Sequence, residues 1–291
     1  MGTSAAENFS LQDLYLREMI IWLQERHGWS MDQAHAAGGE GTLVRSELMT
    51  SPAEVLLRKH TRREFRQRMQ AGELKACIVP VAAVEQHLEH LAMEHDWRSA
   101  VHIATAVAER LRPQVVVAEG LMCGVSEHHM RHPGTLTLSP GAFLAVLDDL
   151  IDSVVRAGFR NVLVLNGHGG NTRPCRGIWD QFLLRYQVNL HFLPYWEVLT
   201  AEDARELMQS GHEEGRFSPG HAQEFETSFA LAMFPENVRT EVWADQPDQT
   251  PSLATAAKGK AFIERIVERV TAYLREMIDG TRLEPIPPHF P

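Results

Sequence analysis

Seven ionisable side chains fall within the twelve residues from Glu85 to Asp96, directly after an apolar run from Ala76 to Val84. All seven are carboxylates or imidazoles: Glu85, His87, Glu89, His90, Glu94, His95 and Asp96. Such a density does not suit a buried core or an ordinary solvated helix face. Mixed oxygen and nitrogen ligands are what Zn²⁺, Mn²⁺ or Fe²⁺ bind in proteins. The stretch predicts a metal site at the end of a strand, which other segments must complete.

A second candidate segment is the glycine-rich turn Asn166–Asn171, which carries His168 and directly follows an apolar stretch, Asn161–Leu165. Glycines let the backbone turn sharply and approach a ligand closely. A phosphate cradle is one alternative, although neither a Gly-x-Gly-x-x-Gly spacing nor a following Gly-Lys-Ser/Thr is present. A structural turn with a surface histidine is another.

A third candidate segment holds His221 and Glu226 near the start of a predicted helix, 225–233. Phe225, Phe229 and Met233 share one face of that helix and predict packing into a core. The polar residues before this face can act as metal ligands. They can equally cap the helix, because acidic residues in the first turn interact favourably with the helix dipole.

Strands and helices alternate from Lys75 onward, which predicts a mostly parallel sheet with helices on both faces. Strands are expected at 76–83, 114–118, 161–165 and 188–193, and helices at 98–111, 139–157, 173–186, 202–209 and 254–278. Ligands in such folds bind at the carboxyl ends of the strands. Glu85, His87 and His168 each follow a predicted strand, so we expect them at the same edge of the sheet.

Residues 1–58 predict an N-terminal helical extension, with an amphipathic helix over 11–27 and a second helix over 51–69 that can break near Thr61. The second helix has a good start, with Ser51 as N-cap and Pro52 at the first position. The apolar stripe of 11–27 can make subunit contacts or pack on its own domain. Residues 281–291 predict an irregular proline-rich tail.

The composition indicates which classes of partner and which cellular compartment to expect. A net charge of -10 at pH 7 argues against a nucleic-acid or anionic-membrane surface. No apolar run approaches the roughly 20 residues of a membrane span. The cysteines are scattered and predict free thiols in a reducing, cytoplasmic compartment: Cys77, Cys123 and Cys175.

The three segments together resemble the creatininase (creatinine amidohydrolase) family of metal-dependent hydrolases. The shared pattern is Glu-Gln-His at 85–87 with Asp96, then Asn-Gly-His-Gly-Gly-Asn at 166–171, then His-Ala-x-x-x-Glu-Thr-Ser at 221–228, in family order. The His-Pro-Gly-Thr segment at 132–135 and the Tyr-Trp pair at 195–196 are also similar. The resemblance implies a three-layer α/β/α domain over residues 59–280.

The resemblance also implies a site with two divalent metal ions. One ion would be held by Glu85, Asp96 and His168, and the other by His87, Asp96 and Glu226, with Asp96 bridging them. Zn²⁺ is expected first, and Mn²⁺ or Fe²⁺ suits the same ligands. Two such ions acidify a water to hydroxide and polarise a carbonyl.

Further residues acquire roles from the resemblance. His221 would transfer a proton to the leaving group, a role that suits an imidazole. Trp196 would line or close over the substrate, although a core indole is an equal alternative. His132 and Leu88 are candidate substrate contacts. For His132, as for His128 and His129, a solvated loop histidine is the plain alternative.

The implied activity is attack of metal-activated hydroxide on a carbonyl of a small cyclic amide or related polar ring compound. Leu88 and Gln223 stand where the family commonly has Gly, and Gly170 stands where creatininases proper have an acid. The sequence is most similar to the 3-dehydro-scyllo-inosose hydrolase branch, in which a ring opens by C–C cleavage. A non-catalytic small-ligand-binding protein is a further alternative. The family also implies a homo-oligomer, often a hexamer.

Overall fold

The computed structural model describes residues 53–210 and 217–287. Four parallel strands form one sheet in the order β2-β1-β3-β4. Their bounds are β1 Ala76–Val81, β2 Val115–Val117, β3 Asn161–Asn166 and β4 Asn189–Pro194. The predicted parallel sheet is confirmed. The helix predicted at 11–27 lies outside the described residues.

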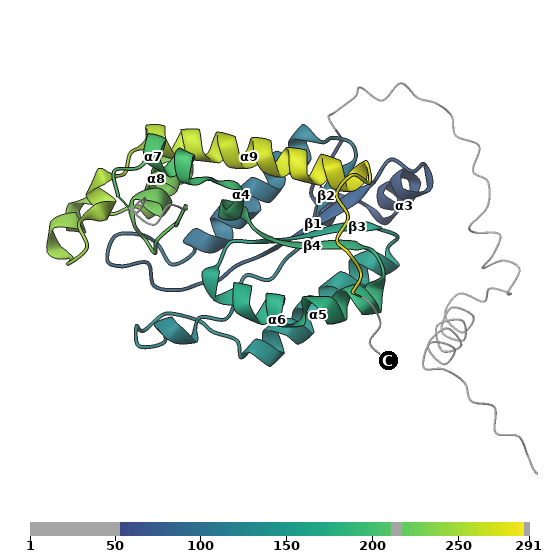
Figure 1. Ribbon diagram of the computed structural model, residues 1–291, viewed down its shortest axis with the longest axis horizontal. Helices are drawn as coiled ribbons and strands as arrows, with labels where there is room; N and C mark the ends of the chain where they lie inside the picture. Colours follow the sequence, from purple (N-terminus) through teal and green to yellow (C-terminus); the bar gives the residue numbers. More distant parts are fainter. Residues whose placement is uncertain (1–52, 211–216, 288–291) are drawn as a thin grey trace, which may run out of the picture. The chain divides into compact units, whose positions relative to one another are not determined.

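Helices cover both faces of the sheet (Figure 1). The helices on one side are α4 (His95–Arg110), α7 (Ala201–Leu207), α8 (Glu224–Met233) and α9 (Ala256–Ile278). Those on the other side are α5 (Pro140–Arg156) and α6 (Thr172–Tyr186). The three-layer α/β/α architecture expected from the sequence is therefore confirmed.

Side-chain alternation along the strands explains why two cores form. In β1 all six residues are buried, with Ala76 and Ile78 in the core beneath α4 and α9. Cys77, Val79 and Val81 point into the core beneath α5 and α6. Successive side chains of a strand face opposite sides, so a continuous apolar run is what a sheet covered on both faces requires.

Capping residues fix where several helices begin. Ser139 caps α5 with Pro140 at its first position, and Thr255 caps α9. The helix α4 begins at His95, three residues before the predicted start. Asp96 consequently lies in the first turn of a rigid helix.

The helix predicted over 51–69 is wrong in its first half. Residues 53–56 instead run along the edge of the sheet, where the amide of Val117 donates to the carbonyl of Val55 at 2.8 Å and Leu56 bridges to Val117. Pairing with the β2 edge and burial of Val55 outweigh the local helix signal. Thr61 then starts α3 (Arg62–Gln70) with a full capping box to Glu64.

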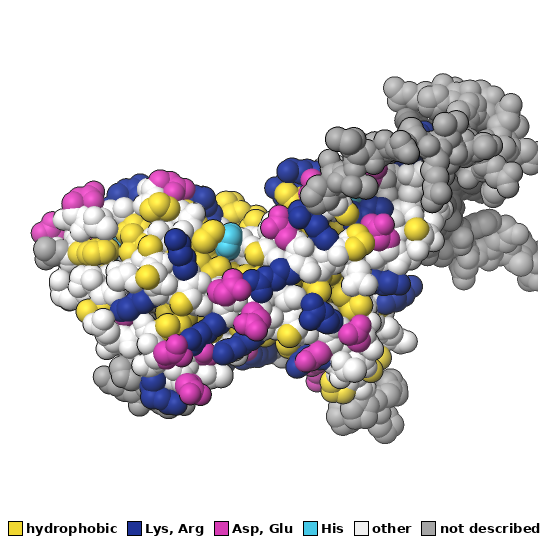
Figure 2. Space-filling view, turned by 90° about the horizontal axis from the view of Figure 1, so that it is seen from above, with side chains coloured by type: hydrophobic (Ala, Val, Ile, Leu, Met, Phe, Trp, Pro, Cys, Tyr) yellow, Lys and Arg dark blue, Asp and Glu magenta, His cyan; other side chains and the backbone are white. Residues whose placement is uncertain are grey.

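The face over α9 mixes acidic and basic side chains (Figure 2). Ion pairs there include Arg110 with Glu264 and Arg265 with Glu206. No helix among the described residues is long and apolar enough to span a membrane.

Asp203 links α7 to α9 and supports a stability prediction. Its carboxylate is 3% exposed and accepts hydrogen bonds from Arg265 at 2.7 Å, Arg269 at 2.9 Å and the amide of Thr200 at 2.7 Å. Burial raises the pKa of Asp203, but the contacts with Arg269, Thr200 and Arg265 outweigh it and hold the pKa well below its usual range. We expect Asp203→Ala to lower the free energy of unfolding by about 2–3 kcal/mol at pH 7, measured by urea denaturation.

Glu206→Ala is the matched control, because Glu206 pairs with the same Arg265 at the surface and should cost under about 0.5 kcal/mol. The pKa of Asp203 is lower in the folded state than in the unfolded state, where it is about 4. Asp203 therefore contributes to the free energy of unfolding fully only above about pH 4. The difference from the unmodified protein should therefore shrink as the pH falls below that value. Equal losses in the two variants would contradict the prediction.

Candidate metal centre

The five predicted metal ligands converge at the carboxyl edge of the sheet. Glu85 and His87 follow β1, His168 follows β3, Asp96 lies in the first turn of α4, and Glu226 lies in the first turn of α8. All five side chains are buried. The surface-histidine alternative for the glycine-rich turn is therefore wrong, because His168 is only 3% exposed.

The five side chains form two buried triads that share Asp96. One is Glu85, Asp96 and His168, and the other is His87, Asp96 and Glu226; within each, the possible ligand atoms lie within 4.8 Å of one another. Asp96 presents one oxygen to each triad. Its Oδ1 lies 3.0 Å from His87 Nε2, and its Oδ2 lies 3.1 Å from His168 Nδ1.

The donor set fits divalent cations. Three buried carboxylates share one small region, and both Glu85 Oε2 and Asp96 Oδ2 are buried without a hydrogen-bond partner among the described residues. A buried charge is costly unless it is paired or binds a metal. Carboxylate oxygens and imidazole nitrogens are suitable ligands for Zn²⁺, Mn²⁺ and Fe²⁺.

The pKa values of the ligand side chains show that the region attracts positive charge. Burial lowers the pKa of His87, but the Asp96 carboxylate outweighs it and raises the pKa to about 9. Burial likewise lowers the pKa of His168, which its contacts with Asp96 and Glu85 raise to about 10. Burial and the negative charge of Asp96 raise the pKa of Glu226 to about 8, against the opposing effect of His87. A cluster that binds protons this tightly is suited to dications.

The ring nitrogens of the two ligand histidines are oriented by backbone carbonyls. His87 Nδ1–H donates to the carbonyl oxygen of Glu85 at 2.9 Å, and His168 Nε2–H donates to that of Val125 at 3.0 Å. The other nitrogen of each ring therefore faces the carboxylates and presents a lone pair when the ring is neutral. Metal-binding histidines generally show this arrangement, in which the outer nitrogen is held by an acceptor.

Close packing places the glycine-rich turn beside α4. A Cβ at Gly167 would lie 2.6 Å from the backbone oxygen of Asp96, so only glycine lets these two segments approach. Asn171 fixes the turn: its Oδ1 accepts from the amide of Val125 at 2.9 Å, and its Nδ2 donates to the carbonyl of Ala82 at 3.1 Å. Gly167 thus allows close contact between protein segments, and Gly167, Gly169 and Gly170 also line the cavity described next.

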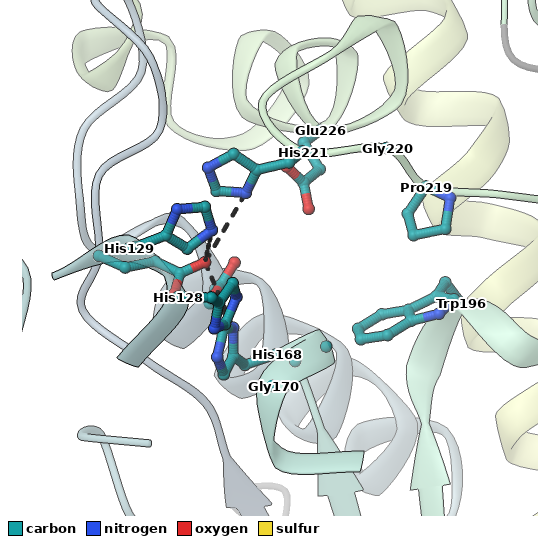
Figure 3. Close-up of a pocket in the computed structure, with 13 residues that line it drawn as sticks. His128, His129, His168, Gly170, Trp196, Pro219, Gly220, His221 and Glu226 are labelled. Atoms are coloured by element: carbon teal, nitrogen blue, oxygen red, sulfur yellow. Dashed lines mark ion pairs between the residues drawn. The ribbon is translucent and has the colours of Figure 1, made fainter. Parts of the chain in front are cut away.

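A cavity of about 330 Å³ opens onto the two triads. Figure 3 shows Trp196 and Pro219 on one side of it, facing the imidazoles of His128, His129 and His168. His221 also lines the cavity, with Nδ1 3.7 Å from Glu85 Oε1. Burial, with the nearby imidazoles, lowers the pKa of His221 to about 4, so that its ring is neutral near pH 7.

Two predicted substrate contacts do not line this cavity. His132 is exposed, and Leu88 packs against the core beneath α4 and α9. Leu88 has a φ of 55°, in the left-handed region that favours glycine. This backbone conformation would suit glycine, the residue that the family resemblance led us to expect at this position, and gives Leu88 a local structural role.

Sequence reasoning gave no role to Gln86 and left His128 and His129 undecided. Both histidines line the cavity. The amide of Gln86 lies 2.8 Å from His129 Nδ1 and 2.9 Å from His221 Nε2. The position of Gln86 between two predicted ligands was the only available signal.

Comparison with known proteins identifies similar hydrolases. The family model "Creatininase: Creatinine amidohydrolase" matches residues 58–251. The chain is 30% identical over 198 residues to the 3-dehydro-scyllo-inosose hydrolase of Thermotoga maritima, covering 67% of this chain and 61% of that protein. It is 30% identical over 203 residues to the creatinine amidohydrolase of Pseudomonas putida, covering 65% of this chain and 76% of that protein.

Solved structures agree with this result. The crystal structure of a creatinine amidohydrolase (creatininase) superposes with a TM-score of 0.68 at 25% identity, covering 79% of this chain and 99% of that one. A mutant creatininase described as Zn-Zn type has a TM-score of 0.65, at 25% identity over 78% of this chain and 99% of that one. A Mn form of creatininase has a TM-score of 0.64, at 25% identity over 77% and 99%.

Proposed function

The chain belongs to the creatininase family of hydrolases, and from this premise we propose that it hydrolyses a carbonyl group of a small polar ring compound at two divalent metal ions. Glu85, Asp96 and His168 would hold one ion, and His87, Asp96 and Glu226 the other. The observation that carries the proposal is the pair of buried triads joined by Asp96. The two forms of creatininase, Zn-Zn and Mn, support Zn²⁺ first and Mn²⁺ next; Fe²⁺ suits the same ligands.

Bound dications would supply an activated water and polarise the scissile carbonyl. The chain itself would orient the substrate. Trp196 presents its indole to the cavity from the side opposite the histidines, where a planar or puckered ring can stack against it. His221 is the side chain that we place beside the leaving group.

The cavity supports a small substrate. Its volume of about 330 Å³ is at the lower end of the range for ligand pockets. Its lining combines carboxylates, imidazoles and one indole, which suits a ring compound rich in hydrogen-bonding groups. A cyclic amide is the first candidate.

A second candidate reaction is C–C ring opening of an oxidised inositol. The 30% identity to a 3-dehydro-scyllo-inosose hydrolase over 67% of this chain favours it. A non-catalytic binding protein is the least supported alternative, because all five ligand positions and His221 carry the expected residues. We also propose that the protein forms a homo-oligomer, such as a hexamer, and that it is located in the cytoplasm.

Zinc-loaded protein should hydrolyse at least one member of a panel of lactams, N-formyl compounds and inosose derivatives. Removal of metal with a chelator should lower the rate at least about 10³-fold, because the ions supply several kcal/mol of transition-state stabilisation. Re-addition of Zn²⁺ should restore the rate, and re-addition of Mg²⁺ is the control for non-specific ion effects. Undiminished activity after chelation, or no turnover of the whole panel by protein with two metal equivalents, would refute the proposal.

A further inference from the structure

The orientation of the Gln86 side-chain amide is fixed by a backbone group. Gln86 Oε1 lies 2.9 Å from the amide nitrogen of Leu88. A backbone N–H can only donate, so the atom facing it must be the amide oxygen. The side-chain NH₂ therefore faces the opposite way, toward His129 Nδ1 at 2.8 Å and His221 Nε2 at 2.9 Å.

This orientation determines which nitrogens of His129 and His221 carry hydrogen. The NH₂ group has two hydrogens and no acceptor, so both facing ring nitrogens must accept. A neutral imidazole that accepts through one nitrogen carries its hydrogen on the other. His129 is thus protonated at Nε2, and His221 is protonated at Nδ1.

The two N–H groups converge on the cavity. His129 Nε2 lies 3.6 Å and His221 Nδ1 lies 3.7 Å from the same oxygen, Glu85 Oε1 (dashed lines, Figure 3). The two rings stack with centroids 4.3 Å apart and planes at 21°. Both distances to Glu85 are too long for a hydrogen bond, and both rings line the cavity, so the two donors are suited to one oxygen atom of a ligand bound there.

The two candidate ligand histidines are oriented differently. The outer nitrogens of His87 and His168 donate to carbonyl oxygens, so the inward nitrogen of each ring is the one that can present a lone pair to a metal. His129 and His221 direct an N–H inward, which cannot bind a metal. Among the described residues, two further clusters have metal-like spacing, Glu85 with His87 and His221, and Glu85 with His128 and His129. The tautomers disfavour both.

We propose that Gln86 is a positioning residue that holds His129 and His221 as paired N–H donors, and that His129 joins His221 in binding a carbonyl or hydroxyl oxygen of the substrate. The binding of a substrate oxygen rests on the proposed function. The tautomers of His129 and His221 rest on the geometry alone. The assignment makes His221 a neutral hydrogen-bond donor in the resting protein. It also adds His129 to the catalytic residues.

The tautomers can be measured without a substrate. In ¹⁵N-histidine-labelled protein, two-bond nitrogen–proton correlation spectra distinguish Nδ1–H from Nε2–H, and His129→Phe and His221→Phe identify the two signals. We expect Nε2–H for His129 and Nδ1–H for His221, before and after Zn²⁺ is added. Zinc should give the large nitrogen shift of direct coordination only at His87 and His168. Tautomers opposite to these, or direct zinc coordination at His129 or His221, would overturn the assignment.

Variants of Gln86 test its role as an orienting group. In Gln86→Glu, one carboxylate oxygen can still accept from the amide of Leu88. The other oxygen can only accept, so the facing nitrogens of His129 and His221 must carry hydrogen, which reverses both tautomers. Gln86→Leu removes the donors and tests the same role without an added charge. Gln181→Glu, at an exposed position of α6, makes the same charge change away from the site and should alter nothing.

For a substrate that the panel identifies, loss of an N–H donor should lower kcat about 100-fold. We expect this loss in Gln86→Glu, Gln86→Leu and His129→Phe, with two zinc equivalents retained. Unchanged tautomers in Gln86→Glu, or unchanged kcat in all three, would refute the role of Gln86. Failure of the unmodified protein to bind zinc would refute the proposed function instead, since the tautomer measurement on metal-free protein stands separately.

Discussion

Replacing Asp96 with alanine is expected to remove both metal ions and to lower kcat by at least about 10³-fold. The reason is geometric, because Asp96 alone belongs to both triads and directs one oxygen to each imidazole. Replacing Glu226, which belongs to one triad, should remove about one ion.

Metal content per chain, measured by elemental analysis after dialysis, separates these outcomes. Glu89→Ala is the matched control, since Glu89 is an exposed acid in the same segment and should retain both ions. Two ions retained in Asp96→Ala would show that Asp96 does not bridge. Equal losses in Asp96→Ala and Glu89→Ala would indicate a general effect of charge.

Metal removal is expected to destabilise the fold by about 5 kcal/mol when free Zn²⁺ stands at about 100 times the dissociation constant of each site. Each site then contributes about 2.7 kcal/mol, because an ion that binds only the folded state stabilises it by mass action. For a domain of this size the change corresponds to a fall in Tm of roughly 10–20 °C. The buried carboxylates Glu85, Asp96 and Glu226 are the origin of the effect, because only the folded chain brings them together with the imidazoles as ligands.

Thermal unfolding with Zn²⁺ and with chelator measures this difference. The Asp96→Ala protein provides the internal control, since it lacks sites to fill and should unfold at nearly the same temperature in both conditions. A Tm of the unmodified protein that is indifferent to Zn²⁺ would contradict the prediction.

Much of the fold could be predicted because its strands are buried on both faces. Such strands read as continuous apolar runs, as in Asn161–Asn166, and alternate with helices whose caps are visible at Ser139 and Thr255. The extended segment before α3 could not be predicted in this way. Val55 and Leu56 pair with Val117 on the β2 edge, and no local pattern reports such a pairing between distant segments.

Glu85, His87 and His168 could be placed at one edge of the sheet because each follows a predicted strand, whereas Asp96 and Glu226 completed the candidate ligand set through the family resemblance. The wall of the cavity could not be predicted. The positions of His128 and His129 depend on how the loop after Val125 packs against Asn171 and Gly170. His132 lies only three residues beyond His129 and yet faces solvent. The amide orientation of Gln86 depends on the backbone of Leu88, which has an unexpected left-handed conformation.

Several candidate ligands and several residues of the cavity wall lie on different kinds of structure. Asp96 and Glu226 lie in the first turns of α4 and α8, and His168 lies just after β3, whereas His128, His129 and Pro219 lie in the connections between β2 and α5 and between α7 and α8. Mutations can therefore accumulate in this part of the wall while these candidate ligands stay in place. Descendants of one ancestral gene could diverge in what they recognise and keep their reaction chemistry. Such a division is consistent with relatives of this chain that carry the names of a creatinine amidohydrolase, an inosose hydrolase and a precursor-peptide peptidase.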